Sequence, residues 1–390
     1  MTQTAPVIML AARRTPVAPV NGAFRGLGVS ELGVPVVAAL LADSGVPASA
    51  VDQVILGNAL YGGGNPARMI ALAAGLPETV PAMTIDTQCC AGLDSLRLAA
   101  AVIQSGQADV IIAGGVESTS RRPIRQHRPL TADATPVAYE RPPFTPWPER
   151  DPDMAAAAAR LAAEQTISLA AQHEWAIESH RKALASRSRL QNECVPLAGL
   201  SMDAAARPLT DRLAQRTPVI ADWQDGEHNS GQISVAGTAL QADAAALVLM
   251  VSGRVARQFA AQRPQVLWEQ GLSGGGAADQ PPRALVPVVS SLLERTGLSA
   301  ADFSVVELME AYAVQAIDNA LALGLPLSAI NRGGGALARG HPIGASGAIL
   351  AVRAFHELQH QLQDQRAGAR ALLAIAAAGG LGSAAILSKH

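Results

Sequence analysis

A segment near the N-terminus of the chain recurs near its C-terminus at a constant spacing. Residues 39–59 read ALLADSGVPASAVDQVILGNA and residues 291–311 read SLLERTGLSAADFSVVELMEA, so the copies align at an offset of 252 without a gap. Each copy has a helical pattern, a glycine that ends it (Gly45 or Gly297) and a short apolar run typical of a strand. One repeat at so long a spacing predicts a fold built from two similar halves, not a solenoid.

The same offset pairs a cysteine with a histidine. Cys89 follows the strand-like run MTIDTQ and precedes the helix-like run AGLDSLRLAAAVIQSGQ. Adding 252 leads to His341 in GHPIGASGAILAVRAFHELQ, a Gly-rich turn that also opens a helix. If the halves pack about a local two-fold axis, these two corners meet at the interface. The repeat therefore predicts that Cys89 and His341 lie close together.

Such a pair suits nucleophilic chemistry. At a helix N-terminus the backbone N–H groups and the helix dipole favour a thiolate, so we expect them to lower the pKa of Cys89. A neutral imidazole at His341 could take the thiol proton. The alternatives are a cysteine that only fills apolar space and a histidine satisfied by backbone groups. Cys90, one residue further around the helix, is expected to pack in the core.

Apolar strand patterns alternate with helical patterns along most of the 390 residues, which predicts α/β layers with largely buried sheets. The exception is a Pro-rich middle part with one long helical pattern, which the repeat does not cover. We expect residues 121–232 to be an inserted domain. Residues 1–120 with 233–253 would then form the first half, and residues 254–390 the second.

Composition excludes several classes of protein. Hydrophobic residues make up 49% and charged residues 16%, which excludes a disordered chain. The formal net charge of −2 leaves no electrostatic footprint for nucleic acid. Three cysteines without CxxC spacing predict no disulfide framework and no metal site. Since no signal peptide or long apolar stretch is present, we expect a cytoplasmic protein that does not enter a membrane.

Most landmarks of the chain resemble the thiolase family, in order. QCCAGLDSL resembles the family's nucleophile motif Cys-x-Ser/Ala-Gly-Leu, and GGVESTSRRP resembles its Gly-Gly-x-Glu-x-Met-Ser block. GGGALARGHPIGASGA matches the block around the active-site histidine almost letter for letter. The resemblance covers essentially the whole chain and is weakest between residues 121 and 232.

The resemblance implies a five-layered αβαβα core from two similar halves, in a homodimer or homotetramer. It implies acyl-coenzyme A substrates and no tightly bound cofactor or metal. Cys89 would be acylated by a thioester, His341 would activate it and help to bind a thioester oxygen, and the N–H of Ala378 would help to hold the acyl carbonyl. The inserted domain would cover the coenzyme A. Possible contacts with that molecule are Arg216 and either Thr238 or Ala239.

Glu310, in the run MEAYAVQ, follows a strand pattern and could orient a histidine in the site. A solvated glutamate that caps a helix is the alternative. Glu117, in GGVESTS, is open to the same two interpretations.

Three positions depart from the family pattern. The second cysteine, in the family's Cys-x-Gly-Gly-Gly motif, aligns with Ala376, whose methyl group cannot carry a proton. The asparagine of Asn-Glu-Ala-Phe aligns with Met309, which cannot donate a hydrogen bond. The histidine before Met-Gly in the loop domain aligns with Asp153. Losing an acid/base group costs about 10²–10⁴-fold in rate, and losing an oxyanion donor about 10²–10³-fold. Ordinary thiolysis is therefore expected to be slow or absent.

Three functions remain open. The first is an acyltransferase that acylates Cys89 and passes the acyl group on in a non-standard step, such as a decarboxylative condensation or transfer to an acceptor with its own nucleophile. The second is a conventional β-ketoacyl-CoA thiolase in which another group replaces the missing cysteine. The third is a non-catalytic acyl-CoA-binding or scaffold subunit. Retention of both Cys89 and His341 argues against the third, because a binding module needs neither.

Overall fold

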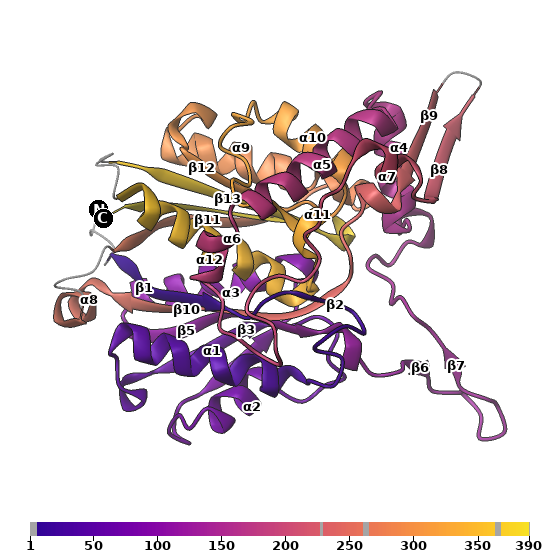
Figure 1. Cartoon of the computed structure of the whole chain (residues 1–390). Helices are drawn as coiled ribbons and strands as arrows, with labels where there is room; N and C mark the ends of the chain where they lie inside the picture. The colour runs from indigo at the N-terminus through magenta and orange to yellow at the C-terminus, as the bar shows by residue number, and fades with distance from the viewer. Residues whose placement is uncertain (1–5, 227–228, 260–264, 363–367, 390) are drawn as a thin grey trace.

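The computed structural model describes residues 6–226, 229–259, 265–362 and 368–389. Helices and strands alternate in five layers (Figure 1). Helices α1 and α2 cover one outer face, α9 and α10 cover the other, and α3 and α12 lie in the middle between two faces of sheet. The five-layered α/β architecture predicted from the sequence is confirmed.

The first half contributes most of its elements before residue 120 and one strand after the inserted segment. These elements are β1 (Val7–Arg14), β2 (Ala18–Pro19), α1 (Val29–Ser44), β3 (Gln53–Gly57), α2 (Pro66–Ala73), β4 (Ala82–Ile85), α3 (Ala91–Gln104), β5 (Val110–Ser118) and β10 (Ala242–Ser252). Helix α8 (Gly253–Phe259) leads out of this half.

The second half follows a similar order in the remaining chain, with the short helix α11 where the first half has β4. Its elements are β11 (Val266–Gly275), α9 (Leu285–Thr296), β12 (Val305–Leu308), α10 (Ala313–Ala322), α11 (Ala336–Arg339), α12 (Ile343–Leu362), β13 (Arg370–Ala377) and β14 (Leu381–Lys389).

Strand pairing repeats in the two halves. The described strands follow the order β12-β13-β14-β11-β1-β10-β5-β3-β4, with β2 paired to β10. Each half combines a parallel pair (β3 with β5, β12 with β13) with antiparallel neighbours. The halves join where the edge strands β1 and β11 pair antiparallel over three residues, from Val7 with Trp268 to Met9 with Val266. The equivalent helices α1 and α9 both end at a glycine in the left-handed conformation, Gly45 at φ 72° and Gly297 at φ 67°.

Helices α3 and α12 approach each other so closely that their contact surface needs glycine. A Cβ added to Gly347 would lie 2.5 Å from the backbone nitrogen of Leu93, and one added to Gly92 would lie 2.7 Å from that of Ala348. The two helices pack into one buried cluster that includes Leu93, Ala345 and Ala348 and side chains from both sheet faces. This contact brings together the chain segments that precede the two helices.

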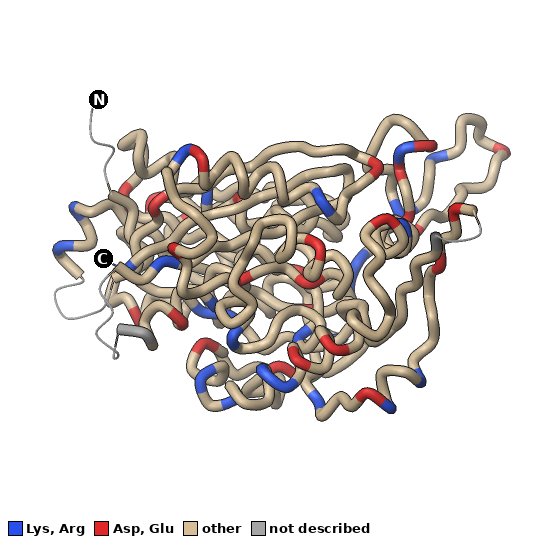
Figure 2. The backbone as a smooth tube through the Cα atoms, turned by 90° about the horizontal axis from the view of Figure 1, so that it is seen from above, with Lys and Arg blue, Asp and Glu red and all other residues tan. Residues whose placement is uncertain are grey.

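Residues 121–232 add no strand to the large sheet within their described part. Their elements are β6 (Gln126–His127), β7 (Val137–Ala138), α4 (Met154–Glu164), α5 (Leu169–Ala185), α6 (Arg187–Gln191), α7 (Asp211–Gln215), β8 (Val219–Asp225) and β9 (Asn229–Ser234). The segment with β6 and β7 extends away from the core as an arm, and β8 and β9 form a separate hairpin (Figure 1). Figure 2 shows Lys and Arg residues interleaved with Asp and Glu along the described chain.

A buried ionic cluster ties this segment to both halves. Glu193 is fully buried and binds Arg14 of β1 at 2.8 Å and Arg353 of α12 at 2.9 Å. Burial raises the pKa of Glu193, but Arg353 and Arg14 outweigh this and hold it at about 2. The carboxylate is therefore charged at neutral pH, and it fixes the inserted segment to the first strand of one half and the central helix of the other.

The α3–α12 contact predicts a clear stability effect. We expect Gly347→Ala to lower the free energy of unfolding by about 1–3 kcal/mol, because its Cβ would displace the backbone at Leu93. Gly26→Ala is the control, since nothing lies within 4 Å of its Cβ position, and we expect it to change stability by less than about 0.5 kcal/mol. Urea unfolding of both variants measures this. Equal stabilities would contradict the close contact.

Candidate active site

Cys89 lies in a tight turn between a strand and a helix. After β4, Gln88 adopts a positive φ of 55°, uncommon for a residue with a side chain, and its N–H donates to Asp86 Oδ1 at 2.8 Å. Cys89 then occupies a 3-10 turn (Gln88–Cys90) that runs directly into α3. Cys90 is buried in the core, as predicted, and its Sγ lies 3.5 Å from the carbonyl oxygen of Ile375.

His341 lies in the equivalent turn before α12. Gly340 precedes it with φ 112°, and the His341 N–H donates to the carbonyl of Leu240 at 2.7 Å. The turn is thereby held against residues 238–241, which connect the inserted segment to β10.

The two turns bring Cys89 Sγ within 3.2 Å of His341 Nε2, which confirms the predicted proximity. On the other side of the ring, His341 Nδ1 lies 2.6 Å from Ser346 Oγ. The Ser346 hydroxyl donates its proton to the carbonyl of Pro342 at 2.9 Å, so it accepts from Nδ1–H. This arrangement leaves Nε2 unprotonated and able to accept the proton of the Cys89 thiol.

Burial keeps this pair neutral. It raises the pKa of Cys89 to about 12, which outweighs the lowering by the backbone N–H groups of Cys89 and Ala378. Burial also lowers the pKa of His341 to about 4. The expectation that the helix terminus lowers the pKa of Cys89 was therefore wrong, because the pKa is raised. Removal from water destabilises the thiolate more than the local dipoles stabilise it. At neutral pH the pair is a thiol and an imidazole.

Ala378 lies in the Gly-rich turn between β13 and β14. Its backbone N–H and that of Cys89 both lower the pKa of the Cys89 thiol. The turn is shaped by Gly379 at φ 75°, and a Cβ there would meet the carbonyl oxygen of Phe144 at 2.9 Å. The inserted segment therefore passes directly over this turn. Two converging N–H groups form a site suited to a carbonyl oxygen that gains negative charge.

Glu117 joins the elements around His341. Its buried carboxylate accepts from the N–H groups of Gly344, Ala59 and Leu60 at 2.9, 3.1 and 3.3 Å, and from Asn58 Nδ2 at 2.9 Å. Gly344 lies in the first turn of α12, so this carboxylate joins that turn to the residues that follow β3. Burial raises its pKa to about 7.

Glu310 is hydrogen-bonded to no histidine within the described ranges, so any role in orienting His341 is indirect and stays a prediction. Its buried carboxylate accepts from Trp175 Nε1 at 3.1 Å, Ser179 Oγ at 2.8 Å, Asn331 Nδ2 at 2.7 Å and the Leu337 N–H at 3.3 Å. It is not a solvated cap either. Its four donors come from α5 and from residues 331–337, so Glu310 holds the chain that leads through α11 to His341.

The predicted coenzyme A contacts occupy different places. Thr238 and Ala239 directly precede Leu240, whose carbonyl accepts from the His341 N–H at 2.7 Å, and this places them beside the turn that carries His341. Arg216 is exposed at the end of α7. The structure therefore brings Cys89, His341, Ala378, Thr238 and Ala239 to one region and leaves Arg216 at the surface of the inserted segment.

The three residues that depart from the family pattern have different surroundings. Ala376 is half-buried near the end of β13 and packs partly against the outer cluster between the sheet and α9. Met309 is buried in the central cluster. Asp153 caps α4 by accepting from the N–H groups of Ala155 and Ala156. Burial raises the pKa of Tyr312, and Asp153 and Cys89 add to this, so the phenol lies within electrostatic range of Cys89.

No group of three or more His, Cys, Asp or Glu side chains in the described ranges could hold a metal ion. None of the described helices is long and apolar enough to cross a membrane.

The neutral pair predicts a distinctive titration. We expect no thiolate at Cys89 between about pH 5 and pH 8, because burial disfavours both ionised partners. The measurement is the thiolate ultraviolet absorbance of the wild type minus that of Cys89→Ala. A thiolate signal that appears with a midpoint below neutral pH would show an ion pair instead and would contradict the neutral state.

The comparisons with known proteins agree with this geometry. Residues 7–253 match the model of the thiolase N-terminal domain, and residues 272–389 match that of the thiolase C-terminal domain. A Bacillus subtilis (strain 168) protein provisionally named acetyl-CoA C-acetyltransferase YhfS is 35% identical over 382 residues, with 97% of each chain covered. A Staphylococcus aureus (strain COL) protein provisionally named acetyl-CoA C-acetyltransferase VraB is 31% identical, with 98% of this chain and 99% of the other covered.

Two solved structures are similar over nearly their whole length. The Bacillus anthracis acetyl-CoA acetyltransferase has a TM-score of 0.88 and 27% identity, with 99% of each chain covered. Human mitochondrial 3-ketoacyl-CoA thiolase in complex with CoA has a TM-score of 0.86 and 26% identity, with 99% of this chain and 98% of the other covered. The family models, the relatives and the fold lead to one conclusion: this chain is an acyltransferase of the thiolase family.

Proposed function

We propose that the chain takes an acyl group from an acyl-CoA thioester onto Cys89 and passes it on in a step other than ordinary thiolysis. The observation that carries the proposal is the 3.2 Å separation of Cys89 Sγ and His341 Nε2, with Nε2 free to accept a proton. The coenzyme A thioester is a substrate, and the chemistry needs no tightly bound cofactor. Because the three cysteines are free thiols, we place the reaction in the cytoplasm.

Acylation uses groups that this chain retains. The Cys89 proton moves to His341 Nε2 as the sulfur attacks the thioester carbonyl carbon. The N–H groups of Cys89 and Ala378 hold the oxygen that becomes negative. When the tetrahedral intermediate collapses, the bond to the coenzyme A sulfur breaks, and that sulfur takes the proton from Nε2. The products are an S-acyl Cys89 and free coenzyme A.

Discharge of the acyl group is the altered step. A thiolase cysteine would deprotonate incoming coenzyme A or a second acyl-CoA, but Ala376 has no proton to exchange and Met309 offers no hydrogen-bond donor. A decarboxylating donor, or an acceptor that brings its own nucleophile, needs no base at this position. These reactions fit the site better than thiolysis does.

The inserted segment, residues 121–232, would cover the coenzyme A. Support comes from Phe144, whose carbonyl lies against the turn with Ala378, and from Tyr312, which packs on the cluster formed by α4 and β9. Thr238 and Ala239 would line the path of the pantetheine, and Arg216 would contact the nucleotide end.

Acylation of Cys89 is tested by intact-protein mass spectrometry after incubation with acetyl-CoA, longer acyl-CoAs and acetoacetyl-CoA. We expect an acyl adduct in the wild type and none in Cys89→Ala. Ser346→Ala should form the adduct about 10–100-fold more slowly, because His341 loses the partner that fixes its tautomer. Lack of an adduct with every donor would contradict the proposal and favour the binding or scaffold function.

The altered discharge step gives a second test. We expect Ala376→Cys to speed the discharge of the acyl-enzyme by free coenzyme A by about 10²-fold or more, because it restores an acid/base group. Ala376→Ser is the control, because serine has nearly the size of cysteine but carries no thiol. Its acyl-enzyme should be discharged by coenzyme A at the rate of the wild type. If the wild type discharges to coenzyme A as fast as Ala376→Cys, the chain is a conventional thiolase.

The oligomer is also open to a test. We propose that two copies pair through the edge strand β4, because Met83 on it and Met69 and Leu72 on the adjacent α2 are exposed apolar side chains beside unpaired strand groups. Sedimentation equilibrium should give a dimer or a tetramer for the wild type and a smaller species for Met83→Lys. Leu321→Lys, which changes an exposed side chain of α10, should leave the mass unchanged. A monomeric wild type would contradict the pairing.

A further inference from the structure

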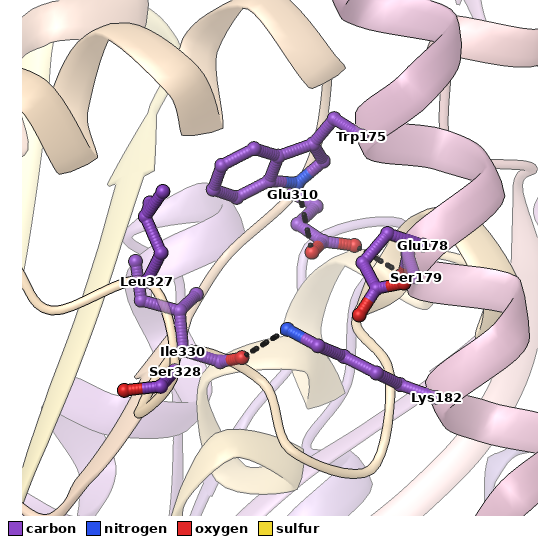
Figure 3. A pocket seen from close by; sticks show the side chains of 8 residues that line it. All are labelled: Trp175, Glu178, Ser179, Lys182, Glu310, Leu327, Ser328 and Ile330. Carbon is purple, nitrogen blue, oxygen red and sulfur yellow. Dashed lines mark hydrogen bonds between the residues drawn. The ribbon is translucent and has the colours of Figure 1, made fainter.

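A cavity of about 320 Å³ lies outside the catalytic pair, between α5 and the chain that follows α10. Helix α5 lines it with Trp175, Glu178 and Lys182, which share one face because they lie one turn apart (Figure 3). Leu327 and Ile330 line the opposite wall. The cavity therefore combines an aromatic ring, aliphatic side chains and three charged groups, the Lys182 ammonium and the carboxylates of Glu178 and Glu310.

Lys182 places an ammonium in the cavity that makes only one hydrogen bond within the described ranges. Its Nζ donates to the carbonyl of Ile330 at 2.9 Å, and across the described ranges no other hydrogen bond or ion pair is seen at this ammonium, which has three N–H donors. Both carboxylates of the cavity have other partners: Glu178 pairs with Arg181 at 2.6 Å through both oxygens, and Glu310 accepts four hydrogen bonds, so within the described ranges neither is hydrogen-bonded or ion-paired to Lys182. An anionic ligand group would give the Lys182 ammonium a charged partner.

The floor of the cavity connects it to the catalytic region. The indole of Trp175 donates to Glu310, and Ser179 also donates to that carboxylate (Figure 3). Glu310 in turn holds the N–H of Leu337 in α11, four residues before His341. A ligand that moves the Trp175 indole would therefore disturb the Glu310 carboxylate, which holds the chain segment that leads to His341.

We propose that this cavity binds a small monocarboxylic acid with an apolar body, and that its occupancy alters the reactivity of Cys89. The carboxylate binds Lys182, and the apolar body lies against Trp175 and Leu327. This site is separate from the one proposed for the acyl-CoA, and its ligand does not react.

Isothermal titration calorimetry with phenylacetate and isocaproate tests the binding. We expect both acids to bind the wild type, and the uncharged phenylacetamide to bind at least about tenfold more weakly, because it cannot form the charged hydrogen bond. Lys182→Gln, which keeps a donor for Ile330, should weaken the acids by a similar factor. Lys389→Gln removes the only other lysine of the chain and should bind like the wild type.

A second variant guards against a folding defect in Lys182→Gln. Leu327 is 60% exposed at the mouth of the cavity, so Leu327→Asp should fold normally and repel the acids. No heat with either acid, or equal affinities for phenylacetate and phenylacetamide, would overturn the site. Unchanged binding in Lys182→Gln and Leu327→Asp would place the acids elsewhere and overturn it as well.

The link to the catalytic pair is measured by alkylation of Cys89 with iodoacetamide, which requires no acyl transfer. We expect saturating phenylacetate to change the alkylation rate in the wild type and in Lys389→Gln, and to have no effect in Lys182→Gln. An equal change in Lys182→Gln would mean that the acid blocks Cys89 directly. No change in the wild type would overturn the link.

Discussion

The contact between the helices that follow Cys89 and His341 is the constraint on which the site depends. Glycine at positions 92 and 347 lets the backbones of α3 and α12 touch between two sheet faces. Each helix begins where a turn from its own half ends, so the contact fixes the distance between the two turns. Glu117 accepts a hydrogen bond from the first turn of α12 and so fixes that turn. The ion pairs of Glu193 with Arg14 and Arg353 fix the inserted segment to β1 and α12.

The same packing determines the chemistry. A cysteine and a histidine this close in water could share charge, but here both are half-buried, and their partial removal from water disfavours the thiolate and the imidazolium alike. The Cys89 thiol would therefore transfer its proton to His341 when the sulfur attacks, and no stable thiolate would form beforehand. In the proposed acylation, the N–H groups of Cys89 and Ala378 would stabilise the oxygen on which negative charge develops. Under the proposed function, acylation keeps the groups it needs, while Ala376 and Met309 stand where the family resemblance would place the groups of the second step.

Much of this arrangement could be predicted from the sequence, because the repeat shows which segments of the two halves occupy equivalent places in the fold. The offset of 252 placed Cys89 and His341 in equivalent turns, and alternating strand and helix patterns indicated the layers. Charge states could not be predicted in this way. The sign of the Cys89 pKa shift depends on how completely the folded protein excludes water from the sulfur, and the helix-terminus argument contained no measure of that burial.

The hydrogen-bond partners of buried side chains could not be predicted from the sequence either. Glu310 follows a strand and resembles a catalytic carboxylate, yet its donors come from residues 175, 179, 331 and 337, which no local pattern connects. Ser346, which sets the tautomer of His341, was missed although it lies only five residues away. The signal was present in GHPIGAS, because a hydroxyl in the first turn of a helix can reach back to the turn before it.

The most direct test of the account is a crystal structure of the protein soaked with an acyl-CoA. The account predicts an acyl group bonded to Cys89 Sγ, with its carbonyl oxygen within hydrogen-bond distance of the N–H groups of Cys89 and Ala378. An intact thioester beside a free Cys89, or an acyl group on Cys90 or Cys194, would contradict it.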